Sequence, residues 1–93
     1  MAEVIVTFKI MPSSVDDDLT AIEKQAVEQL AKHGRVEGVE QQPLAFGLKS
    51  LILYAVFDEQ IGNKVDDFAD ELKSIDGVET CEVEDVRRAI DLD

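Results

Sequence analysis

Residues 48–57 read Leu-Lys-Ser-Leu-Ile-Leu-Tyr-Ala-Val-Phe and are apolar at nearly every position. A short, continuous apolar run of this kind is typical of a strand buried on both faces, so we expect a central strand. Because side chains alternate along a strand, one face would carry Leu51, Leu53, Ala55 and Phe57, and the other Ile52, Tyr54 and Val56. If helices cover only one face, the second is either a subunit or partner surface or an ordinary half-covered sheet.

An unusual loop leads into this strand. In residues 43–47, Pro-Leu-Ala-Phe-Gly, an aromatic residue stands between a proline that restricts the backbone and a glycine that permits turns. Such a stiff bend can hold the Phe46 ring out from the scaffold as a contact. The alternative is a turn whose phenylalanine tucks under the sheet, the more usual place for a large apolar side chain. The residues alone leave both interpretations open.

The amino-terminal third of the chain predicts a strand and then a helix. Residues 3–11 alternate between two faces, and Pro12 ends the strand because proline has no amide hydrogen for the ladder. The three aspartates at 16–18 stand where acidic side chains can cap a helix and meet the positive end of its dipole. Apolar residues follow at helical spacing: Leu19, Ile22, Ala26 and Leu30. We expect Gly34 to cap the carboxyl end of this helix.

The remaining segments predict a strand, a helix and a last strand. Residues 35–42 indicate a short strand, irregular near Gly38. A second helix begins near Asn63 or Asp66, either of which can cap it, and ends at Gly77. Its buried stripe consists of Val65, Phe68, Ala69, Leu72 and Ile75. The last strand runs from Val78 to about residue 83 or 85, with Cys81 and Val83 facing inward, and is followed by a tail that carries two adjacent arginines.

The predicted order is strand, helix, strand, strand, helix, strand. Two right-handed strand-helix-strand units of this size give an α+β fold, the ferredoxin-like two-layer sandwich βαββαβ, with a four-stranded antiparallel sheet and two helices on one face. This architecture hosts RNA binders, metal carriers, ligand sensors and enzymes, so the fold alone does not assign a function.

Length and charge narrow the possibilities. The 93 residues are enough for one domain with one core. The formal net charge of −12 repels phosphate backbones, which disfavours direct binding of nucleic acid. The first residues carry no signal-peptide pattern, and no apolar run is long enough to span a membrane. We therefore expect a soluble, cytoplasmic protein that does not bind membranes.

The candidate catalytic and metal-binding residues are few. Cys81 is the single cysteine, and its apolar surroundings predict a small buried side chain rather than a reactive thiol. His33 is the single histidine and has no nucleophile or second histidine arranged around it in the sequence. The aspartates at 16–18 are not followed by the glycine and closing glutamate of a calcium loop. We expect no enzyme activity, no cofactor and no metal site.

Four segments together resemble a known family. Residues 43–48 are similar to the proline, isoleucine or leucine, small residue, phenylalanine, glycine, leucine signature of the elongation factor 1-beta family in its short archaeal form. The first strand at 4–12, the acidic helix start at 16–19 and the closing Asp-Val-Arg-Arg at 85–88 agree in order and spacing. The resemblance covers nearly all of the chain.

This resemblance implies a function and a fold. Members of the family have the ferredoxin-like fold and are guanine nucleotide exchange factors for elongation factor 1-alpha, the GTPase that delivers aminoacyl-tRNA to the ribosome. The chain would then form a single exchange domain over residues 1–93 that favours the nucleotide-free GTPase, without covalent chemistry of its own.

The resemblance also implies contact residues. The signature phenylalanine contacts the nucleotide-binding domain of the GTPase, which points to Phe46, with Pro43 and Gly47 holding the loop in shape. In eukaryotic relatives a lysine near the carboxyl terminus reaches the magnesium and phosphate site. Here that position falls at about Asp91, which has the opposite charge.

Two mechanisms of magnesium displacement are compatible with the absence of this lysine. Either Arg87 or Arg88 provides the cation from another place, or the factor displaces magnesium by moving the loops of the GTPase. The arginines can instead simply pair with nearby acids. The sequence also permits a function of another class, a ligand-sensing or oligomerising ferredoxin-like module. Its apolar sheet face would bind a second copy through Ile5, Ile52, Tyr54 and Val56.

Overall fold

The computed structural model describes residues 3–14, 16, 18–61 and 64–89. They form six main elements and two short 3-10 turns, η1 (Ala45–Gly47) and η2 (Glu59–Ile61). The main elements are β1 (Glu3–Pro12), α1 (Leu19–Leu30), β2 (Arg35–Pro43), β3 (Lys49–Asp58), α2 (Lys64–Lys73) and β4 (Val78–Ala89).

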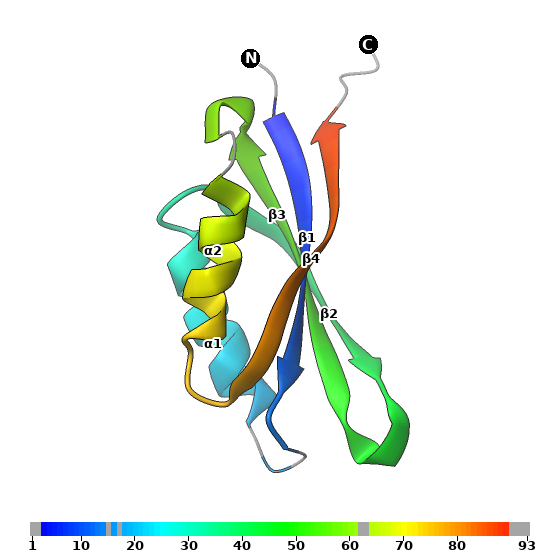
Figure 1. Ribbon diagram of the computed structural model, residues 1–93. Coiled ribbons are helices and arrows are strands. Elements are labelled where there is room, and N and C mark those ends of the chain that lie inside the picture. The colour runs from blue at the N-terminus through cyan, green and yellow to red at the C-terminus, as the bar shows by residue number, and fades with distance from the viewer. Residues whose placement is uncertain (1–2, 15, 17, 62–63, 90–93) are drawn as a thin grey trace.

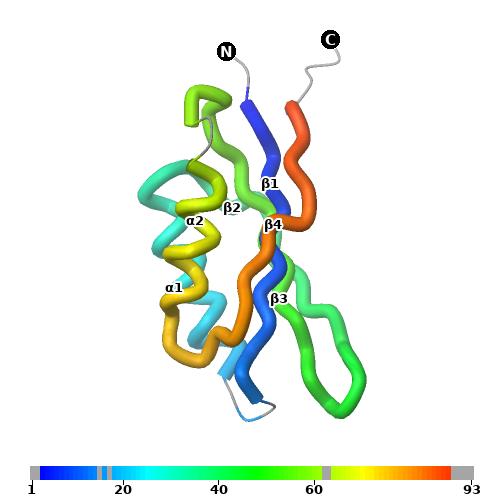
Figure 2. The backbone as a smooth tube through the Cα atoms, in the orientation of Figure 1, coloured from blue at the N-terminus to red at the C-terminus, as the bar shows by residue number. Residues whose placement is uncertain are grey.

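The four strands form one antiparallel sheet in the order β2-β3-β1-β4, and both helices lie on the same face of it (Figure 1). The ferredoxin-like prediction is therefore confirmed. As expected, the apolar run at 48–57 forms an interior strand, since β3 lies between β2 and β1. The molecule measures 43 × 24 × 18 Å. The tube in Figure 2 shows that the main helices and strands run roughly along its long direction.

The core lies between the sheet and the two helices. It combines the alternating residues of β1 and β3 with the apolar stripes of α1 and α2. Phe57 is central: its ring meets Phe8 edge-on at 6.4 Å and Phe68 of α2 at 5.0 Å between centroids. Aromatic pairs at these distances add to the free energy gained by burying apolar area.

The predicted acidic cap of α1 is confirmed at Asp18. Its carboxylate Oδ1 accepts hydrogen bonds from the backbone N–H groups of Thr20 at 3.0 Å and Ala21 at 3.4 Å. Such a cap contributes about 1 kcal/mol because it satisfies amides that have no partner within the helix. Asp17 and Asn63, named as possible caps of the two helices, lie outside the described residues.

The predicted role of Gly34 is wrong. The helix ends at Leu30 with Ala31 in a right-handed cap conformation, and Gly34 follows as the chain turns into β2. A Cβ atom at Gly34 would lie 2.6 Å from Cδ1 of Phe57, and closer still to the carbonyl oxygen of Val56. The glycine is needed because two backbones approach closely there, not because it ends a helix. Similarly, α2 ends at Lys73, and Gly77 lies in the turn beyond it.

The strand boundaries bring one confirmation and one correction. The register of β2 against β3 shifts between Val36 and Gly38, as the expected irregularity near Gly38 requires. The last strand does not stop at residue 83 or 85 but continues through Ala89, because β1 offers pairing partners as far as Glu3. The two arginines predicted to lie in a tail are therefore strand residues.

Candidate partner-binding site

The connection between β2 and β3 is a tight, internally bonded turn. The N–H of Leu44 donates to the carbonyl of Leu48 at 2.7 Å, and the N–H of Leu48 donates to Ala45 at 3.3 Å. Pro43 is the last residue of β2, opposite Lys49 of β3 in the strand register. The hairpin therefore fixes the backbone on both sides of Phe46.

Phe46 projects into solvent from this turn. Its side chain is 95% exposed, compared with 52% for Val86, the other large apolar side chain that is exposed in the described part of the chain. Its backbone has φ 63° and ψ 27°, and Gly47 follows at φ 79°. The left-handed region costs a non-glycine residue about 1–2 kcal/mol, and an exposed ring gains nothing from the hydrophobic effect. The interpretation in which the ring tucks under the sheet is wrong.

The two arginines do not form a joint site. Adjacent strand residues point to opposite faces. Arg87 pairs with Ile5 in the sheet register and its Nε donates to Asp85 at 2.6 Å. Arg88 reaches Glu59 of η2 instead, and this hydrogen bond raises the pKa of the arginine above its usual value. Each guanidinium therefore already has a carboxylate partner.

Phe46 and the arginines lie at opposite ends of the molecule. The hairpin is at the lower right in Figure 1, whereas the end of β4 lies at the top beside the start of β1. Arg87 lies level with Val56 of β3, because both pair with Ile5 of β1. From residue 49 at the hairpin to residue 56, β3 spans roughly 20 Å at a strand rise of about 3.3 Å per residue. The structure thus brings Pro43, Phe46 and Gly47 together and leaves Arg87 and Arg88 apart from them.

An open cleft of about 350 Å³ adjoins the hairpin and was missed by sequence reasoning. It lies between the first turn of α1 and the hairpin, and its lining includes Thr20, Gln41, Gly47 and Lys49. Lys49 stands two residues before the core residue Leu51, so alternation alone places it on the helix-facing side of the hairpin. Alternation along the strand could therefore have placed Lys49 on this side of the sheet. The cleft itself could not be predicted, because it also depends on where the first turn of α1 lies.

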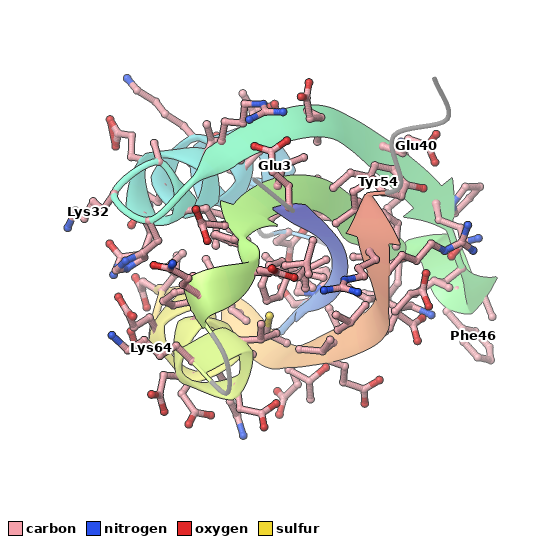
Figure 3. The ribbon with its side chains drawn as sticks, turned by 90° about the horizontal axis from the view of Figure 1, so that it is seen from above. Glu3, Lys32, Glu40, Phe46, Tyr54 and Lys64 are labelled. Carbon is pink, nitrogen blue, oxygen red and sulfur yellow. The ribbon has the colours of Figure 1, made fainter. Side chains whose placement is uncertain are left out.

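Two apolar side chains on the helix-free face of the sheet are buried, although this face has no helix packed against it. Ile52 and Val56 are only 8% and 4% exposed although no helix covers them. Long polar side chains of β2 stand opposite them in the sheet register, Glu40 opposite Ile52 and Arg35 opposite Val56. Tyr54 donates to Glu40 at 3.1 Å, and Figure 3 shows the two residues side by side on this face. The hydrogen bond to Glu40 raises the pKa of the tyrosine.

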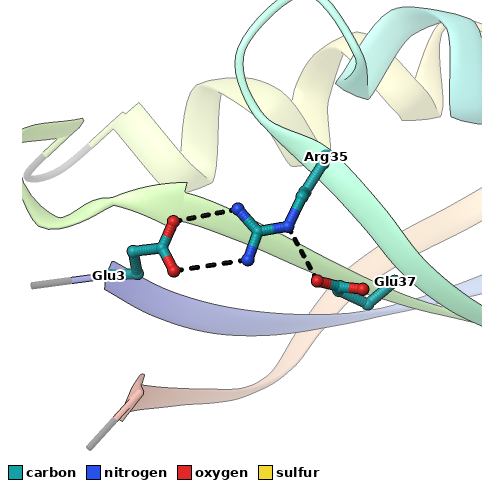
Figure 4. Close-up of polar contacts among 3 residues, drawn as sticks. All are labelled: Glu3, Arg35 and Glu37. Carbon is teal, nitrogen blue, oxygen red and sulfur yellow. Dashed lines mark hydrogen bonds and ion pairs between the residues drawn. The ribbon is translucent and has the colours of Figure 1, made fainter. Parts of the chain in front are cut away.

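Arg35 provides the largest of these polar connections. From β2 it reaches across to β1, where its two terminal nitrogens bond Glu3 at 2.9 and 3.3 Å, and its Nε bonds Glu37 at 2.7 Å (Figure 4). The hydrogen bond from Arg35 lowers the pKa of Glu3. Polar side chains therefore lie over part of this face, whereas Ile5 and Tyr54 line an open pocket of about 240 Å³ on it. Binding of a second copy at this face stays a prediction.

The remaining candidate residues contribute to packing. Burial, with smaller effects from the charges of Glu82 and Asp70, raises the pKa of Cys81 to about 12, so the thiol stays protonated near neutral pH. His33 stacks on Phe68 at 4.2 Å between ring centroids, and its Nε2 lies 3.6 Å from Glu71. Within the described ranges no three His, Cys, Asp or Glu side chains gather as metal ligands would, and no helix is long and apolar enough to cross a membrane.

The described residues thus form a two-layer α+β domain with an exposed aromatic side chain on a hydrogen-bonded hairpin turn, beside a polar cleft. The sequence profile of the EF-1 guanine nucleotide exchange domain family matches residues 5–89 of the chain. The chain belongs to this family.

Curated relatives agree along nearly the whole length. Elongation factor 1-beta of Methanothermobacter thermautotrophicus is 36% identical over 89 residues, which cover 95% of this chain and 98% of the relative. The proteins of the same name from Archaeoglobus fulgidus and Methanosphaerula palustris are 38% and 39% identical, covering 92% and 89% of this chain and 97% and 93% of theirs.

A solved structure supports the fold separately. The C-terminal domain of the MgtC protein from Mycobacterium tuberculosis matches with a TM-score of 0.64, covering 87% of this chain and 84% of that one. At 13% sequence identity the likeness concerns the fold alone.

Proposed function

We propose that this chain promotes the exchange of GDP for GTP on elongation factor 1-alpha by binding the nucleotide-free state of that GTPase. It acts in the cytoplasm as a single exchange domain over residues 1–93. The observation that carries the proposal is the Phe46 side chain, 95% exposed on a backbone held in place before any partner arrives. Because the backbone of the turn is already fixed, it loses little conformational entropy on binding.

The mechanism requires differential affinity rather than chemistry. A factor that binds the empty GTPase more tightly than the GDP-bound one weakens GDP binding by the same ratio, because coupling between two ligands is reciprocal. A tenfold ratio corresponds to about 1.4 kcal/mol. The chain needs no catalytic residue of its own for this, and we propose that it is not an enzyme. Its net charge of −12 is unfavourable for direct contact with tRNA.

The proposed contact set comprises Pro43, Phe46 and Gly47 at one end and Arg87 and Arg88 at the other. The arginines are the weaker part, because each must leave a carboxylate before it can compete with a magnesium ion. Displacement of magnesium by movement of the GTPase loops needs no such exchange of partners. The second route is therefore better supported by the geometry.

The experiment follows release of a fluorescent GDP analogue from elongation factor 1-alpha of a related archaeon. Wild type, Phe46→Ala and the double variant Arg87→Ala/Arg88→Ala are compared at equal concentrations. We expect wild type to accelerate release and the phenylalanine variant to lose more activity than the double variant. No acceleration by wild type overturns the function, and equal rates for all three proteins overturn both contact assignments.

A further inference from the structure

The cleft beside the hairpin contains polar groups that the fold does not use. The side chains of Thr20, Gln41 and Lys49 are exposed, and none makes a hydrogen bond or ion pair with the described part of the chain. They come from α1, β2 and the start of β3, so three separate elements supply them. A hydroxyl, an amide and an ammonium group together can bind an oxygen ligand with negative charge.

The two charged residues that line the cleft, Asp18 and Lys49, differ in whether their charge is already engaged. Asp18 also lines the cleft, but its carboxylate already accepts from two backbone amides of α1, so its charge faces the positive end of the helix. Asp16 is exposed on the same loop, and its N–H bonds Ser14. Among the residues that the structure describes, Lys49 has no carboxylate partner, in contrast to Arg35, Arg87 and Arg88.

The cleft and the aromatic anchor are continuous. Gly47 follows Phe46 directly and lines the cleft, and Lys49 stands two residues further along. Any protein surface that receives the Phe46 ring therefore comes close to the cleft at the same time. Contacts that surround a buried aromatic anchor exclude water from it and orient the partner.

We propose that this cleft receives an acidic side chain of the partner GTPase, with Lys49 forming the ion pair and Gln41 and Thr20 adding hydrogen bonds. The inference rests on the proposed function, since it describes a second contact at the same interface. Lys49 is then a specificity residue: it orients the hairpin so that Phe46 enters its pocket. A charged contact at an interface also increases the association rate at low ionic strength.

The test measures the dissociation constant for nucleotide-free elongation factor 1-alpha at several salt concentrations. Lys49→Glu is compared with Lys64→Glu, which makes the same change in net charge on the side of the molecule away from Phe46 (Figure 3). We expect Lys49→Glu to weaken binding by about tenfold or more and Lys64→Glu by about twofold at most, as is usual for charges outside a contact. Lys49→Gln should also reduce the salt dependence of binding.

The outcomes separate the two proposals. If wild type neither binds the GTPase nor accelerates GDP release, the proposed function fails. If wild type binds but the two glutamate variants weaken binding equally, the cleft inference fails alone. Tighter binding by Lys49→Glu also overturns it, because the occupant is then basic. Since Lys49 and Lys64 are both exposed, the thermal midpoint of each variant provides the check that neither effect arises from unfolding.

Discussion

The two ends of the molecule differ in whether their exposed side chains are bonded within the chain. At the hairpin end, Phe46 lies in solvent and Lys49 has no partner in the described part of the chain. At the other end, Arg35, Arg87 and Arg88 each bond a carboxylate. A group without a partner loses only water when it binds, whereas a paired group must also leave its partner. Under the proposed function, recognition free energy would be concentrated at the hairpin, and the paired end would contribute mainly to the fold.

The largest expected effect comes from removing the ring without changing the turn. Asparagine tolerates the left-handed backbone better than phenylalanine, so Phe46→Asn should keep the hairpin intact. We expect about 30-fold or greater loss in the rate of GDP release at limiting factor concentration, in the range of interface hot spots. The thermal midpoint should stay equal or rise. Phe46→Leu, which keeps an apolar side chain, is the matched variant and should retain part of the activity.

A smaller effect distinguishes a structural from a functional role for Arg88. If the ion pair with Glu59 withholds Arg88 from the GTPase, Glu59→Gln should increase the GDP release rate. If the pair only ties β4 to η2, the same change lowers the thermal midpoint by a few degrees at most and leaves the rate unchanged, because exposed ion pairs contribute little to stability. We expect the second result. A rate increase would contradict the contrast between the two ends.

The smallest effect concerns the pH dependence of the Arg35 network. Arg35 lowers the folded-state pKa of Glu3, so this carboxylate stabilises the fold above its ordinary value of 4.5 and loses that contribution as the pH falls through the folded-state pKa. Arg35→Gln should therefore lower the thermal midpoint at pH 7, and the difference from wild type should shrink below pH 4.5. An unchanged difference from pH 7 to acidic pH would mean that Arg35 stabilises by packing over Val56 instead.

Most of the fold could be predicted from periodicity, because the apolar residues at 48–57 and along both helices match the periods of strands and helices. The site could not be predicted to the same depth. Nothing local in the sequence fixes φ at Phe46, which depends on both strands of the hairpin. The cleft joins residues 20 and 49, which are distant in sequence. The prediction that both arginines lie in a tail is wrong for a simpler reason, which is that β4 continues to Ala89. Within a strand, alternation alone places Arg87 and Arg88 on opposite faces.

The elongated shape affects how the molecule tumbles. A body of 43 × 24 × 18 Å rotates more slowly about its short axes than about its long one. Both helices run roughly along the strands in Figure 1. The backbone N–H bonds of the helices therefore lie near the long axis, whereas the N–H bonds of the strands point across it. Nitrogen-15 relaxation should therefore differ systematically between helix and sheet in the free protein. Capture by a much larger GTPase should remove that difference.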